Sequence, residues 1–571
     1  MKIRDHRPVA RDLVVLVILA AVLGSLGGPP HSHPDHLGRK ALDVLENGGN
    51  PRFFRYPGLM IYLNAFVLAA VFEGMSVLGL AEGSHTVRGF YESHRSLLDA
   101  LGPLITLVFS AAGVVLTYLV TLRIVRDRAF AFIAAFYLLT SILWIADAHF
   151  ATVDVPLAAL ALAAVCFTLR FTAAGTALTL GQTVVLGLWV GLAAAAKYPG
   201  ALAAVAVAGS TWACYRRRRR LWILHGLAAG SVALAVFLAA NPFLLAERDT
   251  FRADFIAELR HARTGHFGYF TAQGWLFHLD ESLVNALGLP VLVLALAGLC
   301  RLVASRAIMP AAKWAVLLFP LAAYALIGSS HLAFQRYVLP VLPFVAVLAG
   351  VGAHAGWLLA RARNLFRSER AARWTICALA LAAALPNAVT VVRHDLILLE
   401  EDTRSILSRV VRAADLEWEA TRVFVRSYVS RPFPKDGRLA TLKSLGEARA
   451  DLIVLDSFNH DRFLYALDGQ GRQDKKPVLA GALAGQDLGR AHLVAISPFT
   501  RPKSEVPFSP KSLYSPYPPD LSLRRAPGPF IEIYCRDRAV ADRLLWACEE
   551  LGVPCERGRG DGGYYFQALR K

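Results

Sequence analysis

Residues 101–122 read LGPLITLVFSAAGVVLTYLVTL and contain no charged side chain. A helix needs about 20 apolar residues to cross roughly 30 Å of hydrocarbon in a bilayer. Similar uncharged runs extend over residues 13–26, 130–146 and 337–359. One soluble core cannot account for so many long apolar blocks, so the sequence predicts a polytopic α-helical membrane protein.

The composition supports this prediction. Of the 571 residues, 55% are hydrophobic and only 18% are charged. The formal net charge of +18 lies mostly in short basic clusters between apolar runs, and Lys and Arg accumulate in cytoplasmic loops of membrane proteins. We therefore interpret these clusters as topology signals and expect no nucleic-acid partner. The first apolar run lacks a small-residue cleavage site before Pro29-Pro30, so we expect a retained helix rather than a signal peptide.

The basic clusters also predict the topology. The apolar blocks lie at approximately 12–28, 57–80, 100–123, 129–147, 154–172, 178–196, 198–215, 221–240, 284–303, 313–328, 337–359 and 373–391. The five basic clusters lie near residues 2–11, 123–128, 216–220, 301–313 and 361–373. These clusters share one side only if the block at 57–80 does not cross, which predicts about 11 transmembrane helices and a juxtamembrane element at 57–80.

This topology places the C-terminal tail outside the cytoplasm. The tail, residues 393–571, is polar and contains short β-like runs beginning at Val423, Leu452, Leu493 and Phe530. With helical stretches between them, these runs predict a small soluble α/β domain. We thus expect a transmembrane module at 1–392 in a bacterial inner (plasma) membrane, followed by a periplasmic or extracellular domain.

The seven cysteines show no zinc-ligand spacing. Three of them, Cys535, Cys548 and Cys555, lie in the tail. An extracytoplasmic tail permits one disulfide among these three, and the sequence leaves its pairing open.

The first predicted outer loop contains His31-Ser-His-Pro-Asp35-His36, directly after the first apolar run. A carboxylate so close to the membrane surface is well placed to accept a proton from a nucleophile that meets a lipid-borne substrate. Loops are also rich in solvated Asp for ordinary reasons. Position alone therefore makes Asp35 a candidate general base and no more.

A second candidate carboxylate follows the fourth apolar block, in His149-Phe-Ala-Thr-Val-Asp154-Val-Pro156. Asp154 precedes a new helix and a Pro, which also suits a helix cap. Capping and catalysis are compatible, because so short a connection keeps both His149 and Asp154 at the membrane surface. His149 is accordingly a candidate substrate contact.

Two cations are expected at the same surface. Lys197 ends an apolar block in the sequence Lys197-Tyr-Pro-Gly200, and Arg336-Tyr337 precedes another. Snorkelling to the headgroups would explain Lys197. Binding of a lipid phosphate would explain it equally well, and Arg can hold phosphate oxygens in a bidentate way.

Taken in order, these motifs resemble the protein-mannosyltransferase-type family of GT-C glycosyltransferases (glycosyltransferase family 39 type, phospholipid-carrier-dependent). The motifs are the Asp of the first outer loop, Tyr56-Pro-Gly-Leu-Met-Ile-Tyr62, His149 to Pro156, Lys197-Tyr-Pro-Gly, Asn241-Pro-Phe-Leu-Leu and Arg336-Tyr-Val-Leu-Pro-Val-Leu-Pro-Phe. The resemblance covers about residues 10–405 and ends near Asp402-Thr403-Arg404.

The resemblance implies an inverting transfer from a polyprenyl-phosphate sugar, with Asp35 as the general base. It further implies that Asp154 orients the base or the acceptor, and that Lys197 and Arg336 stabilise the departing lipid phosphate. Tyr56 and Tyr337 would contact substrate. The expected partners are the lipid-linked donor, membrane lipids and an acceptor that is a protein, a lipid or an envelope glycan.

This sequence departs from the family pattern at two positions. Relatives commonly have Asp-Glu where this chain has Asp35-His36, and His-Pro-Pro where it has Tyr56-Pro57-Gly58. The first change leaves Asp35 as the only carboxylate of its pair, and the second leaves the sugar and acceptor open. Histidines 31, 33, 36 and 149 show no recognisable ligand spacing, so we expect no metal and no other cofactor.

Two other classes of protein remain as alternatives. A transporter or flippase of a lipid-linked glycan would also be polytopic, but it should show duplicated halves or helices broken at the bilayer centre. The sequence contains no internal duplication, and its candidate polar groups gather at one face. A membrane-anchored binding protein would depend on its tail, and intact activity after deletion of the tail would argue against it.

Overall fold

The computed structural model describes residues 7–26, 37–80, 86–215, 218–266, 273–332, 334–418, 421–436, 438–464, 476–506 and 518–570, without the side chains of 95–99. Two compact units are present. The helical unit comprises residues 1–265 and 273–394, and the C-terminal unit comprises residues 266–272 and 395–571. Asp35 and its neighbouring histidines lie outside the described residues.

The helical unit contains helices of very different lengths. They are α1 (Arg7–Ser25), α2 (Leu37–Glu46), α3 (Leu59–Val77), α4 (Val87–Ser93), α5 (Arg95–Val125), α6 (Arg128–Leu139), α7 (Ile142–Ala148), α8 (Asp154–Thr172), α9 (Leu180–Ala196), η1 (Tyr198–Leu202), α10 (Ala203–Tyr215), α11 (Arg219–Ala239), α12 (Arg248–Thr264), α13 (Gly274–Leu276), η2 (Phe277–Leu283), α14 (Val284–Leu287), α15 (Leu289–Ala304), α16 (Pro310–Gly328), η3 (Gln335–Val338), α17 (Leu342–Ala362), α18 (Glu369–Ala382) and α19 (Leu385–Leu398).

The apolar blocks form helices because a chain within lipid must satisfy its own backbone hydrogen bonds. Among the described residues, seven helices are long and apolar enough to cross a membrane, or ten if each of three bent pairs counts as one span. This confirms the predicted polytopic helical class. The predicted number of 11 stays a prediction, because α9 and α10 have only 17 and 13 residues and α3 also qualifies by length and composition.

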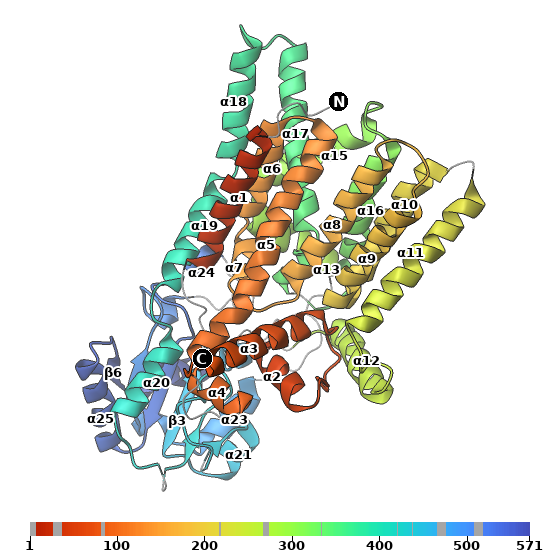
Figure 1. The fold of residues 1–571 in the computed structure, drawn as a ribbon. Helices are drawn as coiled ribbons and strands as arrows, with labels where there is room; N and C mark the ends of the chain where they lie inside the picture. The colour runs from red at the N-terminus through yellow and green to blue at the C-terminus, as the bar shows by residue number, and fades with distance from the viewer. Residues whose placement is uncertain are drawn as a thin grey trace. The chain divides into compact units, whose positions relative to one another are not determined.

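The segment predicted to be juxtamembrane forms α3. In Figure 1, α3 lies across one end of the helical unit, whereas α5 and α8 run along it. A polar residue, Asn64, is buried in α3 and donates to the carbonyl of Met60. Because α3 is apolar enough to span, its juxtamembrane position stays a prediction.

Several apolar segments of the helical unit are interrupted by bends. Helices α6 and α7 meet at a bend of 63° next to Ser141, and α14 and α15 meet at a bend of 109° at Gly288. Gly288 has φ +77°, a conformation that strongly favours glycine. The apolar blocks predicted at 178–196 and 198–215 are separate in the structure: α9 ends at Ala196, and after Lys197 the chain continues as the 3₁₀ turn η1.

The C-terminal unit contains a mixed sheet between helices. Its elements are α20 (Thr403–Ala413), β1 (Val423–Phe424), β2 (Arg438–Leu439), α21 (Leu442–Glu447), β3 (Leu452–Asp456), α22 (Asp461–Leu464), α23 (Lys476–Ala484), η4 (Leu488–Arg490), β4 (His492–Ile496), η5 (Lys503–Glu505), α24 (Pro518–Leu521), β5 (Ile531–Cys535), α25 (Arg538–Glu550), β6 (Glu556–Arg559), η7 (Gly560–Gly562) and α26 (Tyr564–Arg570). The strand order is β2-β1-β3-β5-β4-β6.

Strand β1 pairs in parallel with β2 and β3, and the remaining pairs are antiparallel. Alternation along β3 gives the sheet two apolar faces, since successive side chains of a strand point to opposite sides. Leu452 and Val454 pack with α20 and α25, whereas Ile453 and Leu455 pack with α21 and α23. The predicted α/β domain is therefore confirmed.

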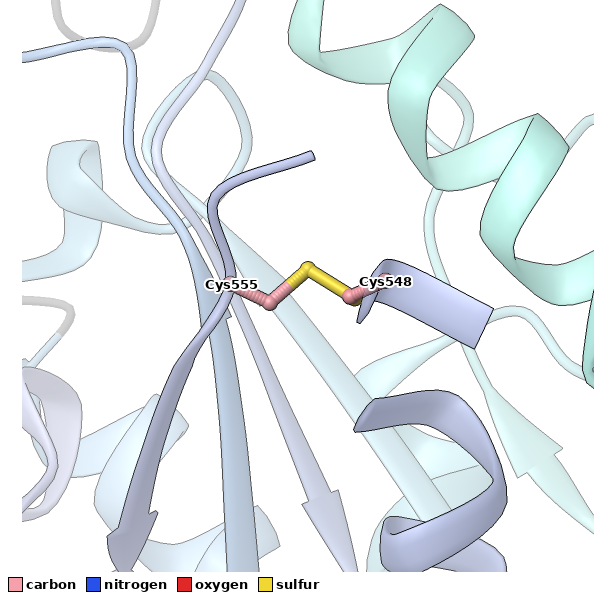
Figure 2. Close-up of a disulfide and its surroundings, with 2 residues drawn as sticks. All are labelled: Cys548 and Cys555. Atoms are coloured by element: carbon pink, nitrogen blue, oxygen red, sulfur yellow. A yellow bond between two sulfur atoms is a disulfide. The ribbon is translucent and has the colours of Figure 1, made fainter. Parts of the chain in front are cut away.

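One disulfide staples the end of this unit. Figure 2 shows Cys548 of α25 bonded to Cys555, which precedes β6, with their Cα atoms 6.1 Å apart. The third cysteine of the tail, Cys535, is a buried free thiol in β5. The structure thus selects one of the pairings that the sequence leaves open.

Candidate functional site

Two of the predicted site residues form a buried ion pair. The Lys197 ammonium donates to Oδ1 of Asp154 at 2.6 Å, with 16% of the Lys197 side chain and 2% of the Asp154 side chain exposed. Asp154 is the first residue of α8 and Lys197 follows the last residue of α9. A carboxylate at a helix N-terminus and a cation at a helix C-terminus are both favoured by the helix dipole.

The backbone around Lys197 explains why the chain turns here. Lys197 is extended (φ −157°, ψ 141°), and Pro199 begins the next helical turn in η1. A Cβ on Gly200 would lie 2.0 Å from the carbonyl oxygen of Ala193. Only glycine permits this close return of the chain, so Lys197-Tyr-Pro-Gly200 holds the ammonium at the helix end.

Two tyrosine rings complete the surroundings of this cation. The Lys197 ammonium lies 4.9 Å from the ring centroid of Tyr337 and 5.8 Å from that of Tyr56. Both distances are within the range of cation–π attraction. Asp154, Lys197, Tyr56 and Tyr337 come from four separate segments, and the structure brings all four together.

Tyr56 is held in place by the segment that follows α11. The backbone N–H of Gly58 donates to Oδ1 of Asn241 at 2.7 Å, and a Cβ on Gly58 would lie 2.5 Å from the carbonyl oxygen of Ala240. The Tyr198 hydroxyl donates to the carbonyl of Phe54 at 2.6 Å. The Tyr56-Pro-Gly and Asn241-Pro motifs therefore pack against each other.

Arg336 lies in the turn η3, next to Tyr337. Arg336 is 8% exposed, and its guanidinium lies 5.5 Å from the ring centroid of Phe334. Tyr337 follows Arg336 in the chain, and its ring centroid lies 4.9 Å from the Lys197 ammonium, so Tyr337 links the two cations. The predicted phosphate-binding pair thus shares one region of the helical unit.

A second buried carboxylate, Asp147, lies in the last turn of α7 and accepts the hydroxyl of Thr152, in the loop before α8, at 2.6 Å. His149 is also buried. Its Nδ1 lies 2.9 Å from the carbonyl oxygen of Ile145, and its Nε2 lies 3.0 Å from that of Leu26. His149 therefore connects this loop to the end of α1, after which the loop with Asp35 begins.

The site offers a carboxylate, cations and aromatic rings. His149 and His394 lie with ring centroids 5.6 Å apart, and they are the imidazoles of this region that could contribute metal ligands. The predicted absence of a metal stays a prediction. Chemically, a buried carboxylate that holds an ammonium beside a second cation suits the binding of an anionic leaving group.

The comparisons with known proteins agree with this architecture. Residues 104–247 match the profile of the family described as dolichyl-phosphate-mannose-protein mannosyltransferase. Comparison with curated protein sequences found no match. The fold is similar to an oligosaccharyltransferase from Archaeoglobus fulgidus in the apo form, with a TM-score of 0.53 and 12% identity, covering 86% of this chain and 73% of that chain.

Two ligand-bound structures also share the fold. ArnT from Cupriavidus metallidurans bound to undecaprenyl phosphate has a TM-score of 0.50 and 15% identity, covering 80% of this chain and 94% of that chain. The oligosaccharyltransferase AglB from Archaeoglobus fulgidus, in complex with an inhibitory peptide and a dolichol-phosphate, has a TM-score of 0.52 and 12% identity, covering 89% of this chain and 77% of that chain. The chain therefore shares the fold of these three solved structures.

The profile match covers only part of the chain. It includes Asp154, Lys197 and Asn241, whereas Tyr56 and Arg336 lie outside residues 104–247. At 12–15% identity, the solved structures establish the fold alone. The roles of individual residues are therefore argued from the geometry of this chain.

Three buried polar residues of this region, Asp147, Gln335 and His278, were not predicted as site residues from the sequence. Asp147 ends an apolar block, and Gln335 precedes Arg336; both are charged or polar residues next to a motif, which is the signal that could have found them. His278 lies in η2, between two predicted apolar blocks, and a single histidine there carries no sequence signal. Burial distinguishes these residues from solvated loop residues, and burial depends on packing.

The Asp402-Thr403-Arg404 motif has a structural role in the C-terminal unit. Asp402 caps α20 by accepting the N–H of Arg404, and it also accepts the Arg404 guanidinium at 2.8–2.9 Å. Thr403 donates to the carbonyl of Pro529 at 2.7 Å. This motif therefore docks α20 against the segment before β5.

Proposed function

We propose that this protein is an inverting glycosyltransferase that moves a hexosyl or pentosyl group from a polyprenyl-phosphate donor to an acceptor hydroxyl, on the outer face of a bacterial inner (plasma) membrane. The observation that carries the proposal is the Lys197 ammonium, bonded to buried Asp154 and flanked by Tyr56 and Tyr337. Such an ammonium still has N–H donors for a phosphate. The GT-C fold and the lipid phosphate bound by ArnT support it.

In this mechanism, the anomeric carbon needs a deprotonated acceptor hydroxyl on one face and a stabilised leaving phosphate on the other. Asp35 takes the proton of the acceptor hydroxyl as the new bond from oxygen to the anomeric carbon forms. The bond from that carbon to the donor phosphate breaks, and the lipid phosphate leaves with the electron pair. Lys197 and Arg336 stabilise the leaving phosphate, and Asp154 holds Lys197 in position.

The disulfide supports the proposed side of the membrane. Disulfides persist in oxidising compartments and are rare in the cytoplasm. The bond between Cys548 and Cys555 therefore favours an extracytoplasmic C-terminal unit. The basic clusters between the helices favour the same orientation.

A transporter or flippase remains the alternative. The bent pairs α6–α7 and α14–α15 are broken helices of the kind that transporters use. The predicted site residues nevertheless gather at helix ends rather than midway along helices. Reconstituted vesicles with a fluorescent polyprenyl-phosphate sugar would show lipid movement without sugar release if the alternative were right.

The direct test uses purified protein and a panel of undecaprenyl-phosphate monoglycosides carrying hexoses and pentoses. Released undecaprenyl phosphate is measured by mass spectrometry. Asp35→Asn keeps the size of the side chain and removes most of its basicity, so transfer should fall by roughly 10²–10⁴-fold with little change in donor binding. Wild-type turnover in Asp35→Asn would contradict Asp35 as the base and make His36 or Asp154 the next residue to test.

The acceptor is addressed by a second experiment. Envelope glycans, glycolipids and glycoproteins are compared by mass spectrometry in cells with and without the protein. The missing product identifies both the sugar and the acceptor. An unchanged set of glycoconjugates in cells that make the donor would contradict glycosyl transfer.

A further inference from the structure

A buried amide without a partner lies in the same turn as Arg336. Gln335 is 2% exposed, and neither its Oε1 nor its Nε2 has a hydrogen-bond partner in the structure. Buried polar side-chain atoms are nearly always hydrogen-bonded, because leaving one unpaired keeps the full cost of removing it from water. An amide with both ends unpaired therefore calls for a missing ligand.

The neighbouring element contains more atoms of this kind. His278 is fully buried in η2, and its Nδ1 lies 3.0 Å from the hydroxyl of Ser282, while its Nε2 has no partner. The Nδ2 atom of Asn285, two residues beyond η2, is also buried without a partner. Elements η2 and η3 pack against each other, so the unpaired atoms belong to two adjoining elements.

The backbone of η2 is itself unusual. Residues 277–283 form a π-helix, a conformation that is rare and frequently occurs at functional sites. The chain then turns by 109° between α14 and α15. The unpaired Nε2 of His278 lies within this π-helix, and η3, which contains Gln335, packs against it.

This group of polar atoms adjoins the candidate phosphate-binding cations. Tyr337, two residues after Gln335 in the same turn, lies 4.9 Å from the Lys197 ammonium. Arg336 is the intervening residue. A donor whose phosphate meets Lys197 and Arg336 would therefore bring its sugar into the neighbourhood of η3.

We propose that Gln335, together with His278, forms a subsite for the hydroxyl groups of the transferred sugar. The ligand class is a neutral polyhydroxylated ring, because an amide offers two donors and an acceptor and each hydroxyl both donates and accepts. The inference rests on the proposed function and deepens it. Sugar binding requires the Gln335 side chain to rotate, since its amide is closed off in the free protein.

The test uses Gln335→Met, which keeps the length of the side chain and removes the amide. The probes are undecaprenyl phosphate and the undecaprenyl-phosphate monoglycoside that the wild type turns over fastest. We expect the donor KM to rise about tenfold, equivalent to about 1.4 kcal/mol, with a smaller change in kcat. The thermal stabilisation by undecaprenyl phosphate should stay at the wild-type value, because that probe carries no sugar.

A second signature separates a substrate contact from a structural residue. Removing an unpaired buried amide should raise the melting temperature of the free protein, whereas loss of a structural contact would lower it. Trp357→Phe is the matched control: it removes the unpaired buried Nε1 of Trp357 in α17 and should leave the donor KM unchanged. Gln335→Asn retains the amide and should recover part of the lost affinity.

The outcomes distinguish the subsite from the proposed function. An unchanged donor KM in Gln335→Met, measured beside an active wild type, would overturn the subsite alone and assign Gln335 to packing. A lower melting temperature together with equal weakening of both probes would overturn it as well. Failure of the wild type to bind undecaprenyl phosphate or to turn over any donor would overturn the proposed function and the subsite with it.

Discussion

The two units each contain a buried Asp–Lys pair with aromatic rings around the ammonium. In the helical unit, Lys197 donates to Asp154 at 2.6 Å. In the C-terminal unit, Lys503 lies 2.8 Å from Asp461, with ring centroids of Tyr564 at 4.9 Å and Phe499 at 5.6 Å. The same chemistry thus occurs twice, in two different settings.

The two pairs differ in how many of their carboxylate oxygens have a hydrogen-bond or ion-pair partner. Asp461 uses both oxygens, one for Lys503 and one for the hydroxyl of Tyr565 at 2.7 Å. Asp154 uses only Oδ1, and its buried Oδ2 has no partner. The Lys503 side chain is 3% exposed and that of Lys197 is 16% exposed. A closed pair stabilises a fold, whereas an open pair retains capacity for a ligand.

The largest expected effect is on stability, in the closed pair. Lys503→Met removes the cation and leaves Asp461 buried without its charge partner. Breaking a buried pair in this way costs about 3–5 kcal/mol. Hydrogen exchange of the full chain should therefore show faster opening of the strands in the C-terminal unit, while the exchange of α8 and α9 stays unchanged.

The pH dependence of this variant gives a sharper form of the same prediction. Burial raises the pKa of Asp461, although Lys503 and Tyr565 oppose the increase, so loss of Lys503 raises this pKa further. The folded state then binds a proton that the unfolded state has released above pH about 4. The unfolding free energy of Lys503→Met should fall as pH rises from 5 to 7, and a pH-independent loss would contradict this account.

The next effect is on activity, in the open pair. Lys197→Met should lower kcat/KM for donor turnover by roughly 10²–10³-fold, the usual result of removing one donor to a developing anion. Lys197→Arg is the matched control because it keeps the charge next to Asp154. If both variants had wild-type donor kinetics, snorkelling of Lys197 to the lipid headgroups would be a sufficient explanation of this residue. The proposed functional difference between the Asp154–Lys197 and Asp461–Lys503 pairs would then be wrong.

A third prediction concerns the disulfide of the C-terminal unit. Replacing Cys548 and Cys555 by Ser removes the constraint on a short loop, which should cost about 2 kcal/mol of unfolding free energy. The same loss should follow reduction of the wild type by dithiothreitol. Sugar transfer at low temperature should remain intact, and a loss of transfer without unfolding would place the disulfide near the chemistry.

The sequence predicted much of this fold because its signals are local. Uncharged runs predict helices, and the strands beginning near Val423, Leu452, Leu493 and Phe530 alternate or are continuously apolar. Strand β6 escaped because it is an exposed edge strand with the sequence Glu-Arg-Gly-Arg. Strand β2 has two residues, too few for any periodicity.

The sequence singled out Asp154 and Lys197 separately as candidates, but it did not predict their contact. Asp154 and Lys197 each carried an ordinary explanation, a helix cap or snorkelling, and they are 43 residues apart. Their contact follows from the packing of α8 against α9, which the pattern of either helix does not encode. Gln335 shows the limit most clearly, since an amide in a turn is normally solvated.

The smallest expected effect isolates the aromatic part of the open pair. Tyr337→Leu removes the ring that lies 4.9 Å from the Lys197 ammonium, and cation–π attraction contributes about 0.5–2 kcal/mol according to exposure. Donor kcat/KM should therefore fall by roughly 2- to 30-fold. Tyr337→Phe keeps the ring and should retain most of the wild-type value if the ring acts as a face for the cation. Equal losses in Tyr337→Phe and Tyr337→Leu would instead show that the hydroxyl matters, as expected if Tyr337 donates a hydrogen bond to the substrate. That result would make Tyr337 a direct substrate contact rather than a residue that only positions the Lys197 ammonium.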